Sequence, residues 1–266
     1  MKILSNHTAI ANFRNVTGKF MKTNMNKEIH PFVKKYPLEP QCKYLVLGTF
    51  PPAQKLDSKK DRQFNVEYFY GNVASFWKII QEIYPKNKFT DIESIRKWQE
   101  EYSIGISDTI LSCKRKKQDS TNDSDLILEW TDYNHELKTY ILENEKFLEK
   151  IIFTSGYNCN NALFNFKIIM GADFVKIASK VVDNLPSPSG GSNTSFFNKN
   201  PNTLGLNNNF YKFIIDSKNI ETITFVQESY NAKLQSKKGE KVKRIPEGTL
   251  KAFKIYMYKQ ILPKSK

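Results

Sequence analysis

The feature that most constrains the fold is a series of short apolar runs separated by segments with helical periodicity. Three runs span residues 44–47, 104–111 and 151–154, and a fourth lies within 174–182. Runs of this length, bounded by glycine or polar residues, are typical of strands buried on both faces. Between them, apolar residues recur every three to four positions, as in Phe76–Ile83, which predicts crossover helices. We therefore predict an α/β fold, a three-layer α/β/α sandwich with a central, mainly parallel four-stranded sheet.

The same pattern divides the 266 residues into a central domain and two extensions. Residues 1–40 are polar and irregular, so we expect an N-terminal extension there. The α/β domain is expected over residues 41–217, and a C-terminal extension packed on or flanking the core over 218–266. Further helices are predicted at 92–102, 137–148, 161–169, 206–217 and 249–260, and a strand-like run at 220–226.

Charge favours a polyanionic partner. Lys and Arg number 41 against 27 Asp and Glu, which gives a formal net charge of +14. An excess of this size is typical of proteins that bind nucleic acid, although a chain rich in lysine throughout also carries it as a compositional bias. The cluster Lys114–Lys117 is a candidate phosphate contact or a solvated face, and the basic loop 233–244 has the same two interpretations.

The cysteines and the hydropathy exclude several classes of protein. Cys42, Cys113 and Cys159 form no C-x-x-C pair, which argues against an iron–sulfur cluster or a structural zinc site and fits reduced thiols. No stretch approaches the roughly 20 apolar residues of a membrane span, and polar residues interrupt the N-terminus. We expect a cytoplasmic monomer that requires no metal or cofactor.

Three turns lie where α/β proteins place ligands, near the carboxyl ends of strands. In the first, Gly48–Gln54, glycine permits an unusual backbone turn and proline stiffens it. In the second, Leu185–Gly191, small residues let backbone amides and hydroxyls approach phosphates closely. The third, Phe69–Asn72, offers aromatic faces and an amide just before a predicted helix. Each turn alone is an ordinary turn, so the evidence lies in their combination.

Together and in this order, the segments resemble the uracil-DNA glycosylase superfamily, most closely its hypoxanthine-DNA glycosylase-like branch. The resemblance covers about residues 43–216. It implies a monofunctional DNA glycosylase that hydrolyses the N-glycosidic bond of a flipped base and leaves an abasic site, in DNA repair or antiviral defence. Four motifs match. The first is a Gly-x-x-Pro loop at Gly48–Pro51, and the second is an aromatic-Tyr-Gly segment at Phe69–Gly71 that leads to Phe76-Trp77. The third is a Gly-Ile…Asp…Cys-x-Arg pattern in a strand and the segment that follows it, from Gly105 to Arg115, and the fourth is a DNA-contacting Pro-Ser-x-Ser-type loop at Pro186–Ser189.

The chain departs from the family pattern at two positions. Several members carry a water-activating Asp, Glu or Asn in the first loop, where this chain has Phe50, a residue that would stack under an extruded base or pack in the core. The hypoxanthine-type branch uses an Asn before the Phe-Trp helix, where this chain has Ala74 in a stretch one residue shorter, with Asn72 as the nearest amide. Asp108 lies in an otherwise apolar strand, where a carboxylate needs a function or a partner. It is a candidate to orient water and stabilise a cationic sugar, or a capping or ion-paired structural residue.

These considerations give three sets of candidate site residues. The catalytic candidates are Asp108 and Asn72. The base-binding candidates are Thr49, Phe50, Pro51, Tyr70 and Gly71. The DNA-binding candidates are Pro186, Ser187, Pro188, Ser189, Gly190, Lys114, Arg115 and Lys116.

The target base stays open between uracil, hypoxanthine and a modified cytosine. Phe50 and Ala74 also suggest a different class of protein, a catalytically inactive DNA-binding protein on the same fold. A third class is a nucleotide- or RNA-processing α/β protein.

Overall fold

A four-stranded parallel sheet forms the centre of the molecule, with strand order β3-β2-β6-β7. Its strands are β2 (Tyr44–Gly48), β3 (Ile104–Asp108), β6 (Lys150–Phe153) and β7 (Val181–Val182). The computed structural model describes residues 26–53, 66–71, 74–155, 160–182, 185–188, 208–216 and 247–265. The parallel register sets Gly48 opposite Asp108 and Leu47 opposite Phe153, so the carboxyl ends of three strands meet at one edge.

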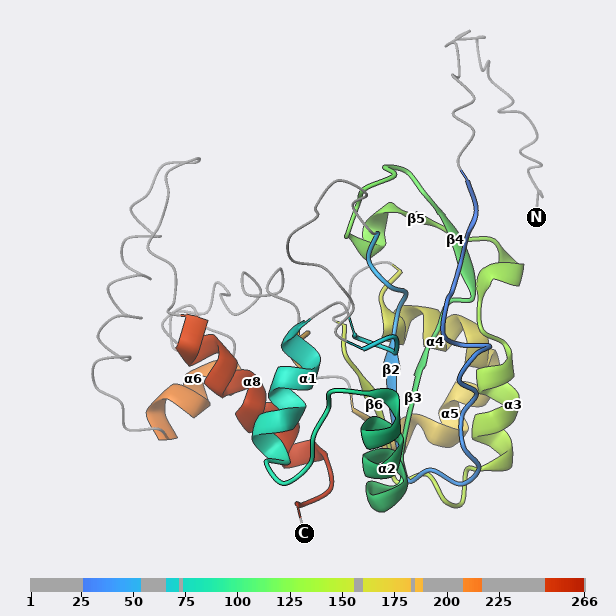
Figure 1. The fold of residues 1–266 in the computed structure, drawn as a ribbon. Coiled ribbons are helices and arrows are strands. Elements are labelled where there is room, and N and C mark those ends of the chain that lie inside the picture. Colours follow the sequence, from blue (N-terminus) through green and yellow to red (C-terminus); the bar gives the residue numbers. More distant parts are fainter. Residues whose placement is uncertain are drawn as a thin grey trace, which may run out of the picture.

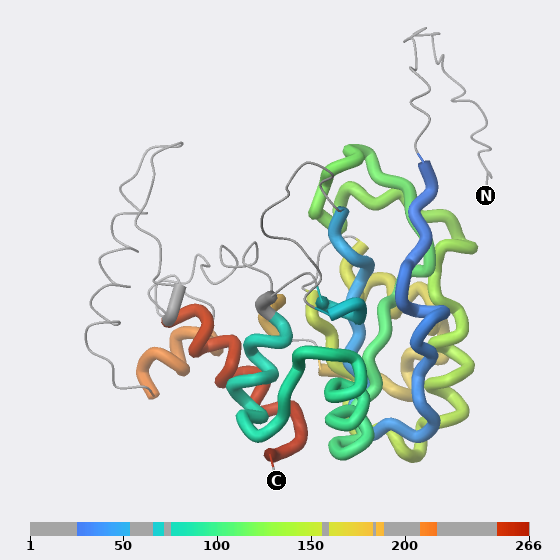
Figure 2. Tube along the Cα trace, viewed as in Figure 1, coloured from blue at the N-terminus to red at the C-terminus, as the bar shows by residue number. Residues whose placement is uncertain are grey.

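Helices cover both faces of this sheet (Figures 1 and 2), as the sequence predicted. Because side chains alternate along a strand, Val46 faces one apolar core while Leu45 and Leu47 face the other. The first core is covered by α1 (Ala74–Ile83) and α2 (Ile92–Tyr102). The second is covered by α3 (Glu136–Glu143), α4 (Ala162–Met170) and the short α5 (Phe174–Ile177). The predicted three-layer α/β fold is therefore confirmed.

A second, antiparallel sheet lies at the carboxyl edge of the first, near the top of Figure 1. Its order is β1-β4-β5, formed by β1 (Glu28–Ile29), β4 (Ser112–Arg115) and β5 (Leu126–Ile127). Two 3-10 helices flank β5, η1 (Asp123–Asp125) and η2 (Trp130–Asp132). The part of the N-terminal extension that follows β1 packs into the first core through Phe32, Val33 and Tyr36.

The C-terminal segment packs on the α1 side of the molecule (Figure 1). Helix α8 (Glu247–Ile261) contacts α1, and its Tyr258 joins the first core. On its other side α8 packs against α6 (Asn208–Asp216) through Phe210, Ile214 and Phe253. None of the helices in the described part of the chain combines the length and the apolar character needed to cross a membrane.

Two predicted strands differ in extent from the observed ones. The run 104–111 was predicted as one strand, but β3 ends at Asp108 because residues 109–111 pair with residues 132–134 instead of β2. The Asn134 N–H donates to the Thr109 carbonyl oxygen at 2.9 Å, and the Leu111 N–H donates to the Asp132 carbonyl oxygen at 2.7 Å. Within 174–182, only Val181–Val182 is a strand, whereas the apolar residues before it form α5. The strand-like run 220–226, the basic loop 233–244 and Cys159 lie outside the described residues.

Candidate active site

Gly48 brings two functional side chains together at the carboxyl edge of the sheet. A methyl group at this position would lie 2.2 Å from Asp108 Oδ1 and 2.6 Å from the Tyr70 hydroxyl. Carbon atoms do not approach oxygen so closely, so only glycine lets the carboxylate and the phenol meet over the end of β2. The two turns that the sequence set at Gly48 and Tyr70 therefore converge on Asp108.

Tyr70 is held in a constrained conformation. Its backbone φ is 60°, a left-handed value that is uncommon for a bulky residue and that clusters at functional sites. Its ring stacks on Phe76 at a centroid distance of 4.3 Å, and its hydroxyl bonds to Thr154 Oγ1 at 2.9 Å. Burial and the charge of Asp108 raise the pKa of Tyr70 well above its usual value. The phenol therefore stays neutral, and the negative charge at this junction belongs to Asp108.

Asp108 is buried, with 6% of its surface exposed, and its two carboxylate oxygens have different environments. Oδ2 accepts a hydrogen bond from His30 Nε2 at 2.7 Å. Oδ1 has no hydrogen-bond partner among the described residues, although it is fully buried. Most buried polar atoms are paired, so an unpaired carboxylate oxygen at this edge has capacity to bind a water or a substrate atom. The partner that the sequence analysis anticipated for Asp108 is His30.

The hydrogen bonds of His30 fix its tautomer. Nδ1 accepts from the backbone N–H groups of Phe32 and Val33, at 3.0 and 3.2 Å, so this nitrogen carries no proton. The proton therefore lies on Nε2, which donates to Asp108. The ring is enclosed by aromatic side chains, including Phe50 at 5.2 Å and Phe69 at 5.6 Å between centroids. A neutral imidazole orients the carboxylate without neutralising it.

Sequence reasoning did not identify His30. It precedes the predicted domain, and the segment that contains it has no motif. The structure places it there because β1 pairs with β4 and because the His30 N–H donates to the Leu111 carbonyl oxygen at 2.8 Å. The strand-compatible residues Glu28-Ile29 just before His30-Pro31 are the only sequence signal of this arrangement in the described part of the extension.

Thr49 connects a second carboxyl group to the same edge. Its hydroxyl lies 3.2 Å from Ser155 Oγ and acts on the Asp123 carboxyl of η1, whose pKa it lowers. Ser155 Oγ in turn accepts from the Ala162 N–H at 2.7 Å, at the start of α4. Burial raises the pKa of Asp123 to about 6; the Thr49 hydrogen bond opposes this shift, the charge of Asp108 adds to it, and Arg115 opposes it. The sequence analysis did not single out Asp123, because it lies in a polar turn.

Arg115 is buried, with 5% of its surface exposed, and its guanidinium group holds three segments together. It donates to the Glu28 carboxylate, to the Ser120 carbonyl and, at 2.7 Å, to the Pro51 carbonyl. These bonds fasten β1, the turn after β4 and the first loop to one another. We expected Arg115 to contact DNA phosphates, but its burial inside the protein favours a structural role.

The neighbouring lysines are more accessible than Arg115. Lys114 forms a 3.5 Å ion pair with Glu129, and 39% of its side chain is exposed. Lys116 is exposed and donates to the Ser124 carbonyl oxygen at 3.0 Å. Both side chains retain N–H groups for a further anion.

The remaining residues of the first and third turns are packed in the protein. Phe50 is half-buried against Ile110, Cys113 and Leu126, an arrangement that favours the core-packing interpretation over base stacking. Pro51 is half-buried, and its carbonyl is held by Arg115. Gly71 is buried, and a methyl group there would lie 1.8 Å from the Val66 carbonyl oxygen. Ala74 is the first residue of α1, whereas Asn72 lies outside the described residues.

The Pro-Ser turn is joined to Tyr70 through two aromatic rings. The Tyr258 hydroxyl donates to the Pro186 carbonyl at 3.3 Å, and Lys254 Nζ donates to the Pro188 carbonyl at 3.4 Å. The Tyr258 ring meets the ring of Phe76, on which Tyr70 stacks. Ser187 is half-buried in this turn, whereas Ser189 and Gly190 lie outside the described residues.

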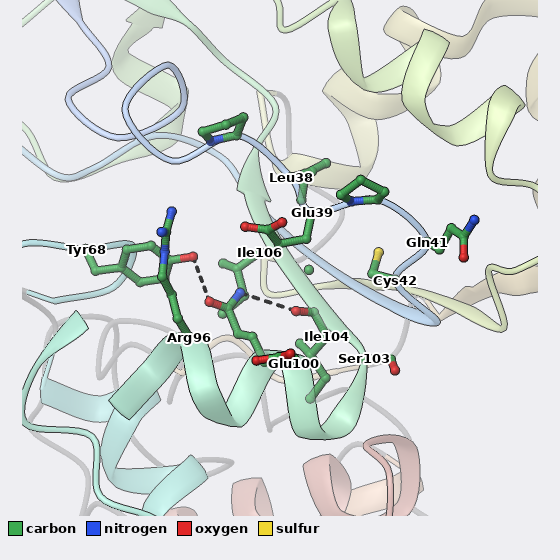
Figure 3. A pocket seen from close by; sticks show the side chains of 14 residues that line it. Leu38, Glu39, Gln41, Cys42, Tyr68, Arg96, Glu100, Ser103, Ile104 and Ile106 are labelled. Carbon is green, nitrogen blue, oxygen red and sulfur yellow. Dashed lines mark hydrogen bonds between the residues drawn. The ribbon is translucent and has the colours of Figure 1, made fainter. Parts of the chain in front are cut away.

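A cavity of about 480 Å³ opens at the opposite edge of the sheet, near the amino ends of β2 and β3 (Figure 3). Its lining includes Cys42, Tyr68, Arg96 and Gln99. The Tyr68 hydroxyl donates to Gln99 Oε1 at 2.9 Å, and Gln99 Nε2 donates to the Ile104 carbonyl at 3.3 Å, so these polar groups satisfy one another. Asp108 does not line this cavity, so we locate the chemistry at the carboxyl edge. Within the described ranges, no three His, Cys, Asp or Glu side chains are grouped to hold a metal ion.

Comparison with known proteins gives limited information. No protein-family model matches the sequence, and no curated protein matches it. Among solved structures, the chain is similar to the solution structure of a candidate uracil DNA glycosylase from Methanosarcina acetivorans, with 19% sequence identity over 59% of this chain and 83% of that chain and a TM-score of 0.37. A TM-score this low does not establish a shared fold, so the functional interpretation depends on the geometry of the carboxyl edge.

Proposed function

We propose that the protein is a monofunctional DNA glycosylase of the uracil-DNA glycosylase type, with Asp108 as its catalytic carboxylate. The observation that carries this proposal is the buried Oδ1 of Asp108, which no described residue hydrogen bonds, at the carboxyl edge of a parallel sheet beside Tyr70 and Gly48. Ligands of open α/β sheets bind at this edge. The net charge of +14 supports a nucleic-acid substrate.

The carboxylate would serve two purposes in this reaction. Hydrolysis of an N-glycosidic bond passes through a cationic sugar, which a fixed negative charge stabilises. It also needs a base that orients a water molecule and accepts its proton, and Oδ1 can do this because it has no hydrogen-bond partner in the described part of the chain. His30 occupies Oδ2 and so keeps the carboxylate in one orientation.

The base would lie against the first and third turns. Thr49 and Tyr70 supply hydroxyl groups at this edge, and Gly71 and Pro51 shape the backbone on either side. We retain Asn72 as a candidate for contact with the base edge or the water, since it follows Gly71 directly. Extrusion of a base costs a few kcal/mol, which contacts in such a pocket offset.

The DNA strand would follow the exposed lysines and the Pro-Ser turn. Lys114 and Lys116 lie on and after β4, which continues from the carboxyl end of β3. The turn formed by Pro186, Ser187 and Pro188, continuing to Ser189 and Gly190, would bind phosphates through backbone amides and hydroxyls. Uracil, hypoxanthine and a modified cytosine are the candidate bases, and DNA repair or antiviral defence the corresponding roles.

Base release is the direct test. Oligonucleotides that carry a single uracil, hypoxanthine or 5-hydroxymethylcytosine, single-stranded and in duplex, are incubated with the protein and then treated with alkali to cleave abasic sites. We expect cleavage with one of them, and an Asp108→Asn variant should lose about 10²–10⁴-fold in rate with little change in DNA affinity. Asp125→Asn, in η1, is the matched control and should retain the wild-type rate. Equal rates for Asp108→Asn and the wild type would remove Asp108 from the mechanism.

A DNA-binding protein without catalysis is the second candidate function. Two observations favour it: Phe50 packs in the core where relatives carry a polar residue, and Ala74 begins α1 where the related branch carries an Asn. This candidate predicts salt-sensitive DNA binding and no abasic product with any of the oligonucleotides.

A further inference from the structure

The second sheet, β1-β4-β5, has one face turned inward and one face turned away from the protein core (Figure 1). On the inner face, the buried side chains of Cys113 and Arg115 alternate along β4, and Glu28 of β1 bonds to Arg115 at 2.9 Å. The residues between them point the other way, because neighbours along a strand alternate and directly opposite residues share a face. These residues are Ile29 of β1, Ser112 and Lys114 of β4, and Ile127 of β5, which pairs with Lys114.

Short polar contacts attach η2 and Lys27 to this same side of the sheet. The Ser112 hydroxyl bonds to Asp132 Oδ1 at 2.5 Å, and Lys27 Nζ forms an ion pair with the same oxygen at 2.7 Å. Lys114 pairs with Glu129 at 3.5 Å. Trp130 lies between Glu129 and Asp132 in the chain, so its ring emerges beside these contacts. We call Lys27, Ile29, Ser112, Lys114, Ile127 and Trp130 together the outer face.

The outer face combines exposed apolar groups with accessible cations. Ile29 is 66% exposed and Trp130 is 63% exposed. Lys27 and Lys114 keep their ammonium groups accessible beside them, in spite of their ion pairs. An aromatic ring among lysines is the arrangement by which proteins bind unpaired nucleotides, since a base stacks on the ring while its phosphates meet the cations.

The charges of the outer face favour an anionic partner. Its buried carboxylate, Asp132, is already compensated by Lys27, Ser112 and the Glu129 N–H, which donates at 2.8 Å. The carboxylate of Glu129 is paired with Lys114. Lys116, the next residue on the Lys114 side of β4, forms no ion pair with a carboxylate in the described part of the chain and bonds to the Ser124 carbonyl instead. A positive charge is therefore left over along this row.

The outer face is continuous with the candidate active site. Ile29 directly precedes His30, so neighbouring side chains of one segment serve the surface and the Asp108 carboxylate. On the other strand, Ser112 follows Asp108 by four residues, which span at most about 14 Å. Successive phosphates of a B-form strand are about 3.4 Å apart along the helix axis, so this span corresponds to about four nucleotides.

We propose that the outer face binds single-stranded DNA, namely the unpaired nucleotides next to the base that enters the site. One base stacks on Trp130 and packs against Ile29, and the phosphates lie against Lys27 and Lys114. In a duplex every base is already stacked between its neighbours, so only an unpaired base can use this ring. The inference rests on the proposed glycosylase function and deepens it, because it assigns single-stranded or locally unpaired DNA as the substrate class.

The intrinsic fluorescence of the protein reports on this surface directly. The chain has three tryptophans, and Trp77 and Trp98 are buried, so a bound base reaches the ring of Trp130 alone. A short oligothymidylate should quench the fluorescence in a saturable manner, and the same strand paired with oligodeoxyadenylate should bind more weakly. This measurement uses the full chain and does not depend on turnover.

Trp130→Ala should lower the affinity for oligothymidylate about 5- to 100-fold, measured by anisotropy of a labelled strand. The slope of log affinity against log salt should stay the same, because the substitution removes no charge. The unfolding midpoint should also stay the same, since the ring is exposed. Ile29→Ser should weaken binding by a smaller factor.

Phe147→Ala is the matched control. Phe147 is also an exposed aromatic residue, but it lies three positions before β6, at the amino edge of the parallel sheet. Its substitution should leave the affinity for oligothymidylate unchanged. An equal loss of affinity in Phe147→Ala and Trp130→Ala would overturn the outer face as the binding surface.

The possible outcomes separate this inference from the proposed function. Quenching that disappears in Trp130→Ala supports the outer face, even when none of the three modified oligonucleotides releases a base and the glycosylase function falls. Base release together with equal affinities of the wild type and Trp130→Ala overturns the outer face alone. Absence of quenching, with a dimer in sedimentation that Trp130→Ala dissociates, overturns it in favour of contact between two copies of this chain.

Discussion

At the scale of single residues, the close approach at Gly48 is the most demanding requirement of the site. Gly48→Ala would place a methyl group 2.2 Å from Asp108 Oδ1. The carboxylate cannot retreat easily, because His30 holds its other oxygen. We expect a loss of about 1–3 kcal/mol in stability, typical of overpacking, and a loss of base release beyond what the stability change explains.

Gly171→Ala is a suitable control for that substitution. Gly171 has φ 55°, and a methyl group added there would meet no atom within 4 Å, so alanine costs stability through backbone strain alone. Its thermal midpoint should fall while base release is kept. If Gly48→Ala behaves in the same way, the close approach at Gly48 has no functional importance.

His30 is expected to act as a positioning residue. His30→Ala leaves Asp108 Oδ2 buried without its donor, which should lower stability by about 1–3 kcal/mol and reduce base release. His30→Gln keeps an N–H donor and should restore part of the rate. Measurement of kcat and the unfolding midpoint for both variants, with His135→Ala as a remote control, separates positioning from bulk stability. A rate unaffected by His30→Ala would contradict this role.

At the scale of elements, β4 carries the buried Arg115 beside Lys114, and Lys116, a proposed phosphate contact, follows the strand directly. Arg115→Met removes the bonds to Glu28, Ser120 and Pro51 and should lower the unfolding midpoint, with little effect on the salt dependence of DNA binding. Lys116→Met should leave the unfolding midpoint unchanged and reduce the slope of log affinity against log salt by about 1. Titrations of labelled duplex at several salt concentrations measure both. An Arg115→Met slope reduced as much as that of Lys116→Met would show that Arg115 reaches DNA.

The strands and helices of the core were predictable because local pattern decides them. The helix at 92–102 matches α2 in its bounds, since Asp91 caps its start and Ser103, with φ 53°, ends it. The segment 174–177 was not predictable, because a four-residue apolar run fits a strand and a buried helix equally well. The end of β3 depends on the pairing of residues 109–111 with residues 132–134, which is a long-range contact that local pattern does not contain.

The same distinction separates the predicted and the unpredicted residues of the site. Asp108 was identified because a carboxylate in an apolar strand is a local anomaly, and Gly48 and Tyr70 because they belong to recognisable turns. His30 reaches the site through a hydrogen bond to Asp108, 78 residues away along the chain, from a polar segment that looks ordinary. Arg115 looked like part of a basic surface cluster, because sequence does not reveal which member of such a cluster points inward.

At the scale of the whole molecule, the C-terminal helix belongs to the folding unit. Tyr258 and Leu262 of this region lie in the first core, and the Tyr84 hydroxyl donates to the Pro263 carbonyl at 2.6 Å. Burial of each large apolar side chain contributes about 1.5–3 kcal/mol against a total stability of about 5–15 kcal/mol. A chain that ends at residue 246 should therefore lose cooperative unfolding, as monitored by circular dichroism during thermal denaturation.

A chain that ends at Pro263 is the control for this deletion, because it keeps α8 and the bond from Tyr84. It should unfold at the wild-type midpoint. If the chain that ends at residue 246 also unfolds at that midpoint, the C-terminal region is an appendage and not part of the core.

His30 belongs to a segment that precedes the strands of the parallel sheet in the sequence, and this order has a practical and an evolutionary consequence. A recombinant fragment trimmed to residues 41–266 would leave Asp108 without its imidazole partner and the first core without Phe32, Val33 and Tyr36, so we expect it to be less stable and less active than the full chain. Under the proposed function, we expect substitutions in the segment around residue 30 to reduce base release more than DNA binding. Homologues should therefore be sorted by that segment before they are sorted by their sheet.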